Sequence, residues 1–140
     1  MNTDISSEMF WLACNVILTA AMVIPYAVYR VGKLGGLWQA FLRPLPGDAP
    51  FDDDWAHRAY RAQMNAFEGM TMFAPAVIAV QVTGTGTEMT ALASAIFFWA
   101  RLAFAPLYYF KVPVFRTAIW FVSLAAILFL GLHVILVALT

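Results

Sequence analysis

Long apolar stretches alternate with polar connections along this chain. Four of the stretches are long enough to cross a bilayer, which takes about 20 mostly apolar residues in a helix. They cover residues 9–30, 55–82, 89–110 and 115–139. None of them alternates strictly between apolar and polar positions, and each is far longer than a membrane strand of about 9–11 residues. The pattern therefore predicts an all-α integral membrane protein whose protomer is a four-helix bundle.

The three connections between these stretches differ in character. The first, roughly residues 31–54, contains glycines, prolines and the acidic triplet Asp52-Asp53-Asp54. We expect the triplet to begin the second helix, because carboxylates cap free N–H groups and favour the positive end of a helix. The second connection, residues 83–88, is a short turn that makes its two helices antiparallel neighbours, and Pro113 in the third forbids a continuous helix. We expect residues 1–140 to form a single membrane domain.

Basic residues in the connections predict how the chain is oriented in the membrane. Lys and Arg occur around the first and third connections, whereas the second connection and both ends of the chain have none. The positive-inside rule then places loops one and three in the cytoplasm and both termini on the opposite side. The first residues lack the basic segment of a signal peptide, so the first stretch is predicted to be a retained span. The five tryptophans mostly lie near the ends of the spans, as an aromatic belt requires.

Composition excludes several classes of protein. Apolar residues make up 63% of the chain and charged residues 11%, against about 45–50% and 25% in soluble domains. A chain this short cannot hide such an excess in one core, which argues against a soluble domain. Eight basic residues balance eight acidic ones without any basic run, so no nucleic-acid partner is expected. One cysteine and two distant histidines predict no metal site.

Several polar residues nevertheless interrupt the second and third apolar stretches. Spacings of three, four and three residues place a stripe within about 80° on one helical face; its members are Arg58, Arg61, Asn65 and Glu68. In the third stretch, Arg101 and Tyr108 are seven residues apart and share a face. Charged side chains inside membrane spans usually face a bundle interior or an aqueous cavity. Each of these residues is therefore a candidate for a functional site.

Two interpretations of these charges compete. In a purely structural one, Arg61 and Glu68 join an ion network between helices and Arg58 reaches toward the interface. The excess of cations favours a functional interpretation, because a single intramembrane anion, Glu68, faces five arginines near or inside the spans: Arg30, Arg58, Arg61, Arg101 and Arg116. A cavity lined by arginines suits an anionic ligand, since the guanidinium fork matches carboxylates.

Two segments of the chain resemble known sequence blocks. The segment Arg61-Ala62-Gln63-Met64-Asn65-Ala66-Phe67-Glu68, followed by Phe73, is similar to the second-helix signature of the MAPEG family, the membrane-associated proteins in eicosanoid and glutathione metabolism. The segment from Ala100-Arg101-Leu102 to Tyr108, followed by Pro113 and Arg116, resembles the second block of the same family. Length, four spans, a long first loop and a short second loop agree as well, so the resemblance covers essentially the entire chain.

The resemblance implies an assembly and a ligand. It implies a homotrimer of four-helix protomers that binds glutathione, as a co-substrate, between neighbouring subunits near the cytoplasmic helix ends. The positions that match the glutathione-contacting residues of the family are Arg30, Arg61, Asn65, Glu68, Arg101 and Tyr108. The implied function is that of a detoxifying glutathione transferase or peroxidase acting on lipophilic electrophiles or lipid hydroperoxides. We nominate Arg116 as the residue that activates the thiol, Tyr108 as a supporting donor and Arg101 as the second candidate.

The chain also departs from the family pattern. Phe104 stands where relatives often have tyrosine or histidine, Met64 stands where some members have a further arginine, and no proline directly follows Glu68. These differences bear on substrate class and efficiency more than on fold. Two other functions stay open: a non-catalytic lipid-binding or scaffold member of the same fold, and a small transporter that uses Glu68 as a proton-coupled site. The excess of arginines disfavours the transporter.

Overall fold

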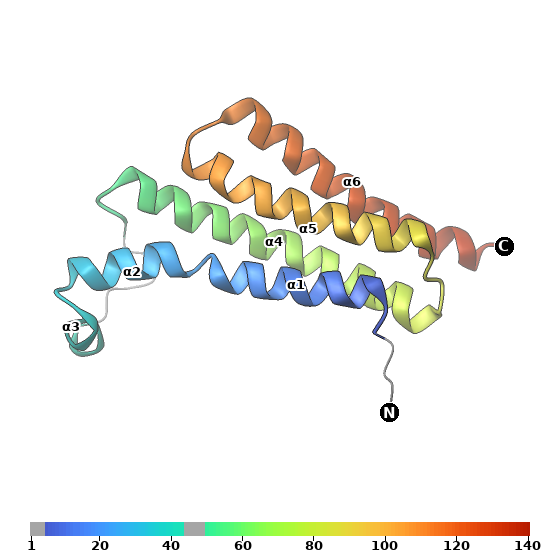
Figure 1. Cartoon of the computed structure of the whole chain (residues 1–140), viewed down its shortest axis with the longest axis horizontal. Coiled ribbons are helices and arrows are strands. Elements are labelled where there is room, and N and C mark those ends of the chain that lie inside the picture. Colours follow the sequence, from blue (N-terminus) through green and yellow to red (C-terminus); the bar gives the residue numbers. More distant parts are fainter. Residues whose placement is uncertain (1–4, 44–49) are drawn as a thin grey trace.

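The computed structural model describes residues 5–43 and 50–140, which form helices and contain no strand. The helices are α1 (Ser7–Ala21), α2 (Ile24–Lys33), α3 (Leu37–Leu42), α4 (Asp54–Thr83), α5 (Glu88–Tyr109) and α6 (Pro113–Ala138). Four helical units in this part of the chain are long and apolar enough to cross a membrane, with α1 and α2 together forming the first. Figure 1 shows these units running side by side, with the short α3 beyond one end of the bundle. The predicted all-α membrane architecture is confirmed.

The first span contains a break that the sequence pattern did not predict. Helix α1 ends at Ala21, and α2 begins at Ile24 after a turn at Met22 and Val23. Pro25 lies in the first turn of α2, where its missing N–H would have no helical partner in any case. The proline therefore starts a new helix after the turn, and the span continues to Lys33.

The acidic triplet begins α4, but not by the expected capping. The helix starts at Asp54, and the side chain of its N-terminal cap residue, Asp53, makes no capping hydrogen bond. The triplet instead binds cations: Lys33 Nζ lies 3.8 Å from carboxylate oxygens of both Asp52 and Asp53, and Arg58 Nη1 lies 3.8 Å from Asp54. The two Lys33 contacts tie the end of α2 to the start of α4, and the Arg58 contact lies within α4. The predicted helix start is thus right, and the predicted side-chain cap is wrong.

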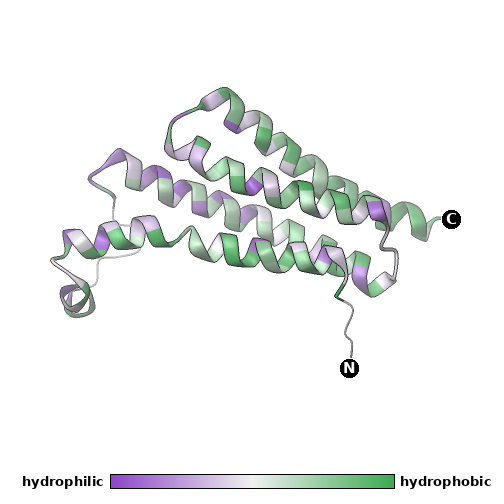
Figure 2. Cartoon of the chain, viewed as in Figure 1, coloured by the Kyte–Doolittle hydropathy of each residue, from purple (hydrophilic) through white to green (hydrophobic). Residues whose placement is uncertain are grey.

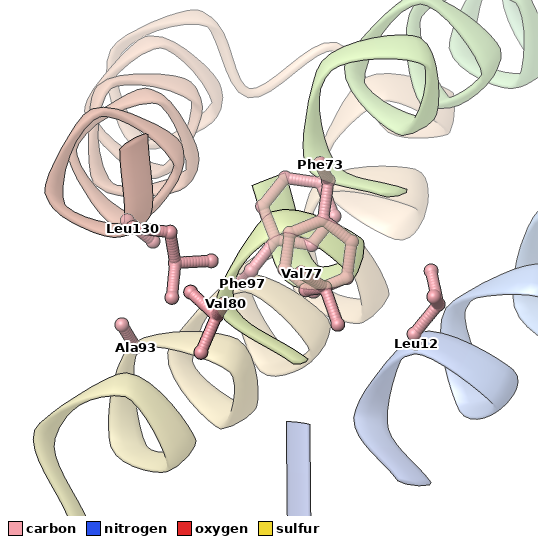
Figure 3. Packing of buried hydrophobic residues seen from close by; sticks show 8 residues of the cluster. Leu12, Phe73, Val77, Val80, Ala93, Phe97 and Leu130 are labelled. Carbon is pink, nitrogen blue, oxygen red and sulfur yellow. The ribbon is translucent and has the colours of Figure 1, made fainter. Parts of the chain in front are cut away.

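The core lies where α4 and α5 contact each other and both outer spans, α1 and α6. Phe73 of α4 and Phe97 of α5 stack with ring centroids 4.0 Å apart, and both are almost fully buried. Val77 packs beside them, with Leu12 from α1 and Leu130 from α6 on either side, as Figure 3 shows. This apolar layer fixes α5 between its neighbours and so sets the height at which Arg101, one turn beyond Phe97, is held.

Polar contacts pin the short loop between α4 and α5. Glu8 of α1 is 5% exposed and accepts a hydrogen bond from the Thr90 hydroxyl, which in turn accepts one from the backbone N–H of Thr87 at 2.7 Å. From the other side, His133 Nε2 of α6 lies 2.8 Å from the Thr85 carbonyl oxygen. The loop is therefore held by both outer spans.

Removal of the Glu8 carboxylate should loosen this end of the bundle. In Glu8→Ala, Thr90 loses a buried partner, which costs about 1 kcal/mol or more and lowers the thermal midpoint in detergent by roughly 4 °C or more. Glu88→Ala, an exposed change in the first turn of α5, is the matched control and should leave the midpoint nearly unchanged. Equal midpoints for the two variants would show that the buried contact adds no stability.

Candidate functional site

A cavity of about 90 Å³ that combines polar and apolar lining residues lies where α4, α5 and α6 meet. Asn65 and Glu68 line it from α4, Arg101 from α5, and Trp120 and Ser123 from α6. Spacing along α4 explains the first two, because residues three apart share a helix face. We refer to this space as the acidic cavity, after Glu68. It brings three of the predicted site residues together within one protomer.

A second cavity of about 190 Å³ adjoins the first. Asn65 and Trp120 line both spaces, which shows that the two are neighbours. The other side chains that contribute to it include Tyr108 of α5 and Arg116 of α6. We refer to this space as the arginine cavity, after Arg116. The two cavities together form one extended depression along α5 and α6.

Arg101 is the most deeply buried charge in these cavities. Arg101 is 4% exposed, its Nη2 donates a 2.9 Å hydrogen bond to Asn65 Oδ1, and its Nε has no hydrogen-bond partner among the described residues. Glu68 attracts it electrostatically, although no carboxylate oxygen of the described residues lies within 4 Å of it. A buried guanidinium is normally paired or fully hydrogen-bonded. Among the described residues, Arg101 therefore keeps one donor N–H without a partner, and its side chain lines the acidic cavity.

Arg116 and Tyr108 meet at the arginine cavity. The Arg116 guanidinium carbon lies 4.7 Å from the centroid of the Tyr108 ring. Pro113 starts α6 three residues before Arg116, so the turn that reverses the chain also brings this arginine back to the C-terminal end of α5. Both side chains are half-buried. A phenolic hydroxyl and a guanidinium thus lie together at one end of the depression.

The remaining arginines lie elsewhere. Arg61 is exposed on α4 and lines neither cavity. Arg30 of α2 is packed over the Phe51 ring, with its guanidinium carbon 4.2 Å from the ring centroid. Arg58 donates a 2.9 Å hydrogen bond from Nε to the Tyr109 carbonyl oxygen at the end of α5. The predicted stripe is therefore divided: Asn65 and Glu68 line a cavity, whereas Arg58 binds a helix end.

Comparison with known proteins places the chain in a family. The family model described as the MAPEG family matches residues 9–136, nearly the entire chain. The chain belongs to the MAPEG family. No curated protein and no solved structure matches it. Membership confirms the resemblance and supports a membrane protein of the general glutathione and eicosanoid type; the MAPEG family includes glutathione transferases and related enzymes together with non-catalytic members.

The structure joins the two MAPEG-like blocks at one place. Asn65 and Glu68 come from the first block, and Arg101, Tyr108 and Arg116 come from the second. Although up to 51 positions separate them in the chain, all five line the two adjoining cavities. Arg30 and Arg61, which the resemblance also nominates, do not line either cavity of the same protomer.

Two residues of this MAPEG protein line the depression although the sequence analysis did not assign them there. Trp120 was expected in an aromatic belt; it lines both cavities and is 37% exposed. Ser123 is buried and donates a 3.1 Å hydrogen bond to the Ile119 carbonyl oxygen. Trp120 follows Arg116 by four residues and Ser123 follows Trp120 by three, and residues at these spacings share one helix face. That spacing was the available signal.

Proposed function

We propose that this MAPEG protein is a membrane-bound glutathione transferase or peroxidase. It activates the thiol of glutathione for attack on lipophilic electrophiles or lipid hydroperoxides. The observation that carries the proposal is the pair of adjoining cavities, one with Glu68 and the buried Arg101, the other with Tyr108 and Arg116. The acidic cavity offers both a negative and a positive charge, and the arginine cavity offers a positive charge and a hydroxyl group. This arrangement suits a ligand that carries several charges along its length and one reactive group.

Glutathione has the chemistry that this arrangement requires. It carries two carboxylates, an α-ammonium group and a thiol. In the proposed complex, Glu68 accepts from the ammonium group, and the Arg101 guanidinium, which lines the acidic cavity, serves a carboxylate together with the amide of Asn65, because guanidinium and carboxylate form charge-assisted hydrogen bonds. The thiol then lies in the arginine cavity. This assignment gives Arg101 a carboxylate partner, which the described residues of the protomer do not supply within 4 Å.

Activation of the thiol follows from electrostatics. A free thiol has a pKa near about 8.5 and is mostly protonated at neutral pH, whereas the thiolate is the nucleophile. Arg116 stabilises the thiolate by its permanent charge, and the Tyr108 hydroxyl donates to the same sulfur. In the transferase reaction, the thiolate sulfur forms a bond to an electrophilic carbon, and the electron pair leaves with the displaced group. In the peroxidase reaction, the thiolate sulfur attacks the terminal oxygen of the hydroperoxide, the O–O bond breaks, and the alkoxide leaves and takes up a proton to become the alcohol. The sulfenic acid of glutathione then reacts with the thiol of a second glutathione to give the disulfide and water.

Charges on the outside of α4 support the proposed homotrimer. Arg61 and Glu68 are exposed on a single protomer, yet both belong to a membrane-spanning helix. A charged side chain facing lipid costs about 2.5–3.5 kcal/mol even on a lenient scale. Neighbouring subunits would cover this face, and Arg30 and Arg61 would then complete the site of an adjacent copy. We place loops one and three, and with them the thiol end of the site, on the cytoplasmic side.

The second substrate should come from the bilayer. Figure 2 shows hydrophilic residues gathered on the N-terminal half of α4, whereas α6 beyond its first turns is almost uniformly hydrophobic. A lipophilic electrophile dissolved in the membrane can therefore approach along the apolar outer surface of α6, and the thiolate end of the site lies near the start of that helix.

The proposal is tested by mixing the purified protein with glutathione in a stopped-flow instrument. We expect thiolate absorbance to rise together with release of protons, electrophile turnover that depends on glutathione, and trimers after cross-linking in detergent. Absence of both thiolate and turnover, with electrophiles of several classes, would refute the proposed enzyme. Sole formation of monomers would refute the shared site.

One observation favours a second candidate, a non-catalytic lipid-binding member of the family. An apolar groove of about 320 Å³ runs between α5 and α6, with walls that include Leu92, Ile96 and Phe129 and a floor that includes Ala93 and Ala126. This candidate predicts lipid retained through purification and no glutathione-dependent turnover. Mass spectrometry of the purified protein, paired with the turnover assay, separates the two functions.

A further inference from the structure

One aromatic ring lines the arginine cavity and contacts a lining residue of each cavity. Phe104 of α5 is 3% exposed. The Arg101 guanidinium carbon lies 4.5 Å from the centroid of its ring, and the Tyr108 ring lies 5.5 Å from it, centroid to centroid. Tyr108 in turn lies beneath Arg116 at 4.7 Å. The order of contacts is therefore cation, ring, ring, cation.

The spacing of residues along α5 produces this row of contacts. Arg101, Phe104 and Tyr108 are three and four residues apart, which places their side chains one above another on the same helix face. Arg116 joins from α6 because the turn at Pro113 returns the chain to this face. The arrangement thus depends on the register of α5, where Phe97 lies in the buried core, and on the turn that precedes α6.

The ring matters most for Arg101. Among the described residues, this guanidinium has one hydrogen bond, from Nη2 to Asn65, while its Nε has none. The face of a ring attracts a cation, and the attraction is stronger where water is excluded, as it is at two side chains that are 4% and 3% exposed. Without the ring, a single hydrogen bond would orient the charge that adjoins Glu68.

We propose that Phe104 is a positioning residue that orients Arg101 by a cation–π contact and sets the Tyr108 ring beneath Arg116. The inference rests on the proposed function and deepens it. It also assigns a use to an aromatic ring that has no proton to donate: thiolate stabilisation falls to Tyr108 and Arg116, and the ring supports both ends of the site. Phe104 acts through these neighbours, not on the sulfur.

Ring fluorination tests this contact with little change in shape. Phenylalanine with one, two and three ring fluorines would replace Phe104, because each fluorine withdraws charge from the ring face. We expect affinity for glutathione and the thiolate fraction at fixed pH to fall stepwise, by about five-fold across the series. The same series at Phe73, which stacks on Phe97 in the core, is the control and should leave both quantities unchanged. Phe104→Leu should lower both the affinity and the thiolate fraction at least as much as the most fluorinated ring does. Phe104→Tyr should leave both quantities close to their wild-type values.

Two outcomes would overturn the inference. In the first, affinity and thiolate fraction stay constant across the fluorinated series, whereas Phe104→Leu lowers both. That result would show that the ring only fills space. The other concerns Arg101 itself: its Nε–H proton signal, identified by its loss in Arg101→Lys, should shift when Phe104→Leu removes the ring current. An unchanged signal would refute the contact. This NMR readout needs no glutathione. If the Nε–H signal differs between the wild type and Phe104→Leu but the wild type forms no thiolate, the proposed function is refuted and the positioning of Arg101 stands.

Discussion

Replacement of Arg116 with alanine should remove most of the thiolate that the protein forms with glutathione. Among the described residues that line the arginine cavity, Arg116 has the only guanidinium, and the Tyr108 hydroxyl cannot by itself supply positive charge. Loss of one aligned donor at a developing anion typically costs about 100-fold or more in rate. We therefore expect kcat/KM toward a lipophilic electrophile to fall about 100-fold, with glutathione affinity changed far less. Stopped-flow absorbance of the thiolate and steady-state turnover give the two measurements.

Two matched variants make this result specific. Arg116→Lys keeps the charge but loses the planar fork, so it should retain part of the thiolate. Lys111→Ala removes an exposed cation that pairs with Asp54 at 3.4 Å outside both cavities, and it should behave as the wild type. If Arg116→Ala and the wild type form equal thiolate, Arg116 has no part in activation, and Arg101, the second candidate, becomes the residue to test.

The spans and much of the site could be predicted because the membrane imposes a strong signal. In a short chain, an apolar run of about 20 residues has few structural alternatives to a membrane span, and a polar or charged side chain inside such a run calls for an explanation. Asn65, Glu68, Arg101 and Tyr108 stood out for that reason, and four of the five cavity-lining candidates lie on two helices whose spacing alone places them on shared faces.

The features that were not predicted depend on contacts between helices. Periodicity placed Arg58 in the same stripe as Asn65, but Arg58 binds the Tyr109 carbonyl oxygen because α5 ends beside it. Trp120 is apolar and lies in an apolar helix, so only its distance from Arg116 hints at a cavity. The use of Arg30 and Arg61 depends on a neighbouring subunit in the proposed trimer, and no pattern within one chain measures a contact between copies.

The Glu68 carboxylate should decide how glutathione is recognised. Glu68→Gln nearly preserves shape while it removes the negative charge, so an ammonium group would lose its charged acceptor. Hydrogen bonds to charged groups contribute about 1.5–3 kcal/mol, which corresponds to an affinity loss of roughly 10- to 100-fold. Titration calorimetry with glutathione should show this loss, whereas an analogue of glutathione without the α-amino group should bind the wild type and Glu68→Gln almost equally.

The pair of ligands turns this experiment into a test of one contact. An equal loss for both ligands would mean that Glu68 supports the cavity, for instance through its attraction to Arg101, without contacting the ammonium group. Glu88→Gln, an exposed change at the opposite end of the bundle, should alter neither affinity. The same Glu68 variant also tests the transporter: proton-linked flux in liposomes that disappears in Glu68→Gln, with no discrimination between the two ligands, would favour transport over glutathione chemistry. Selective loss of affinity for the ligand that carries the amino group would instead assign the one anion of the depression to the one cation of glutathione.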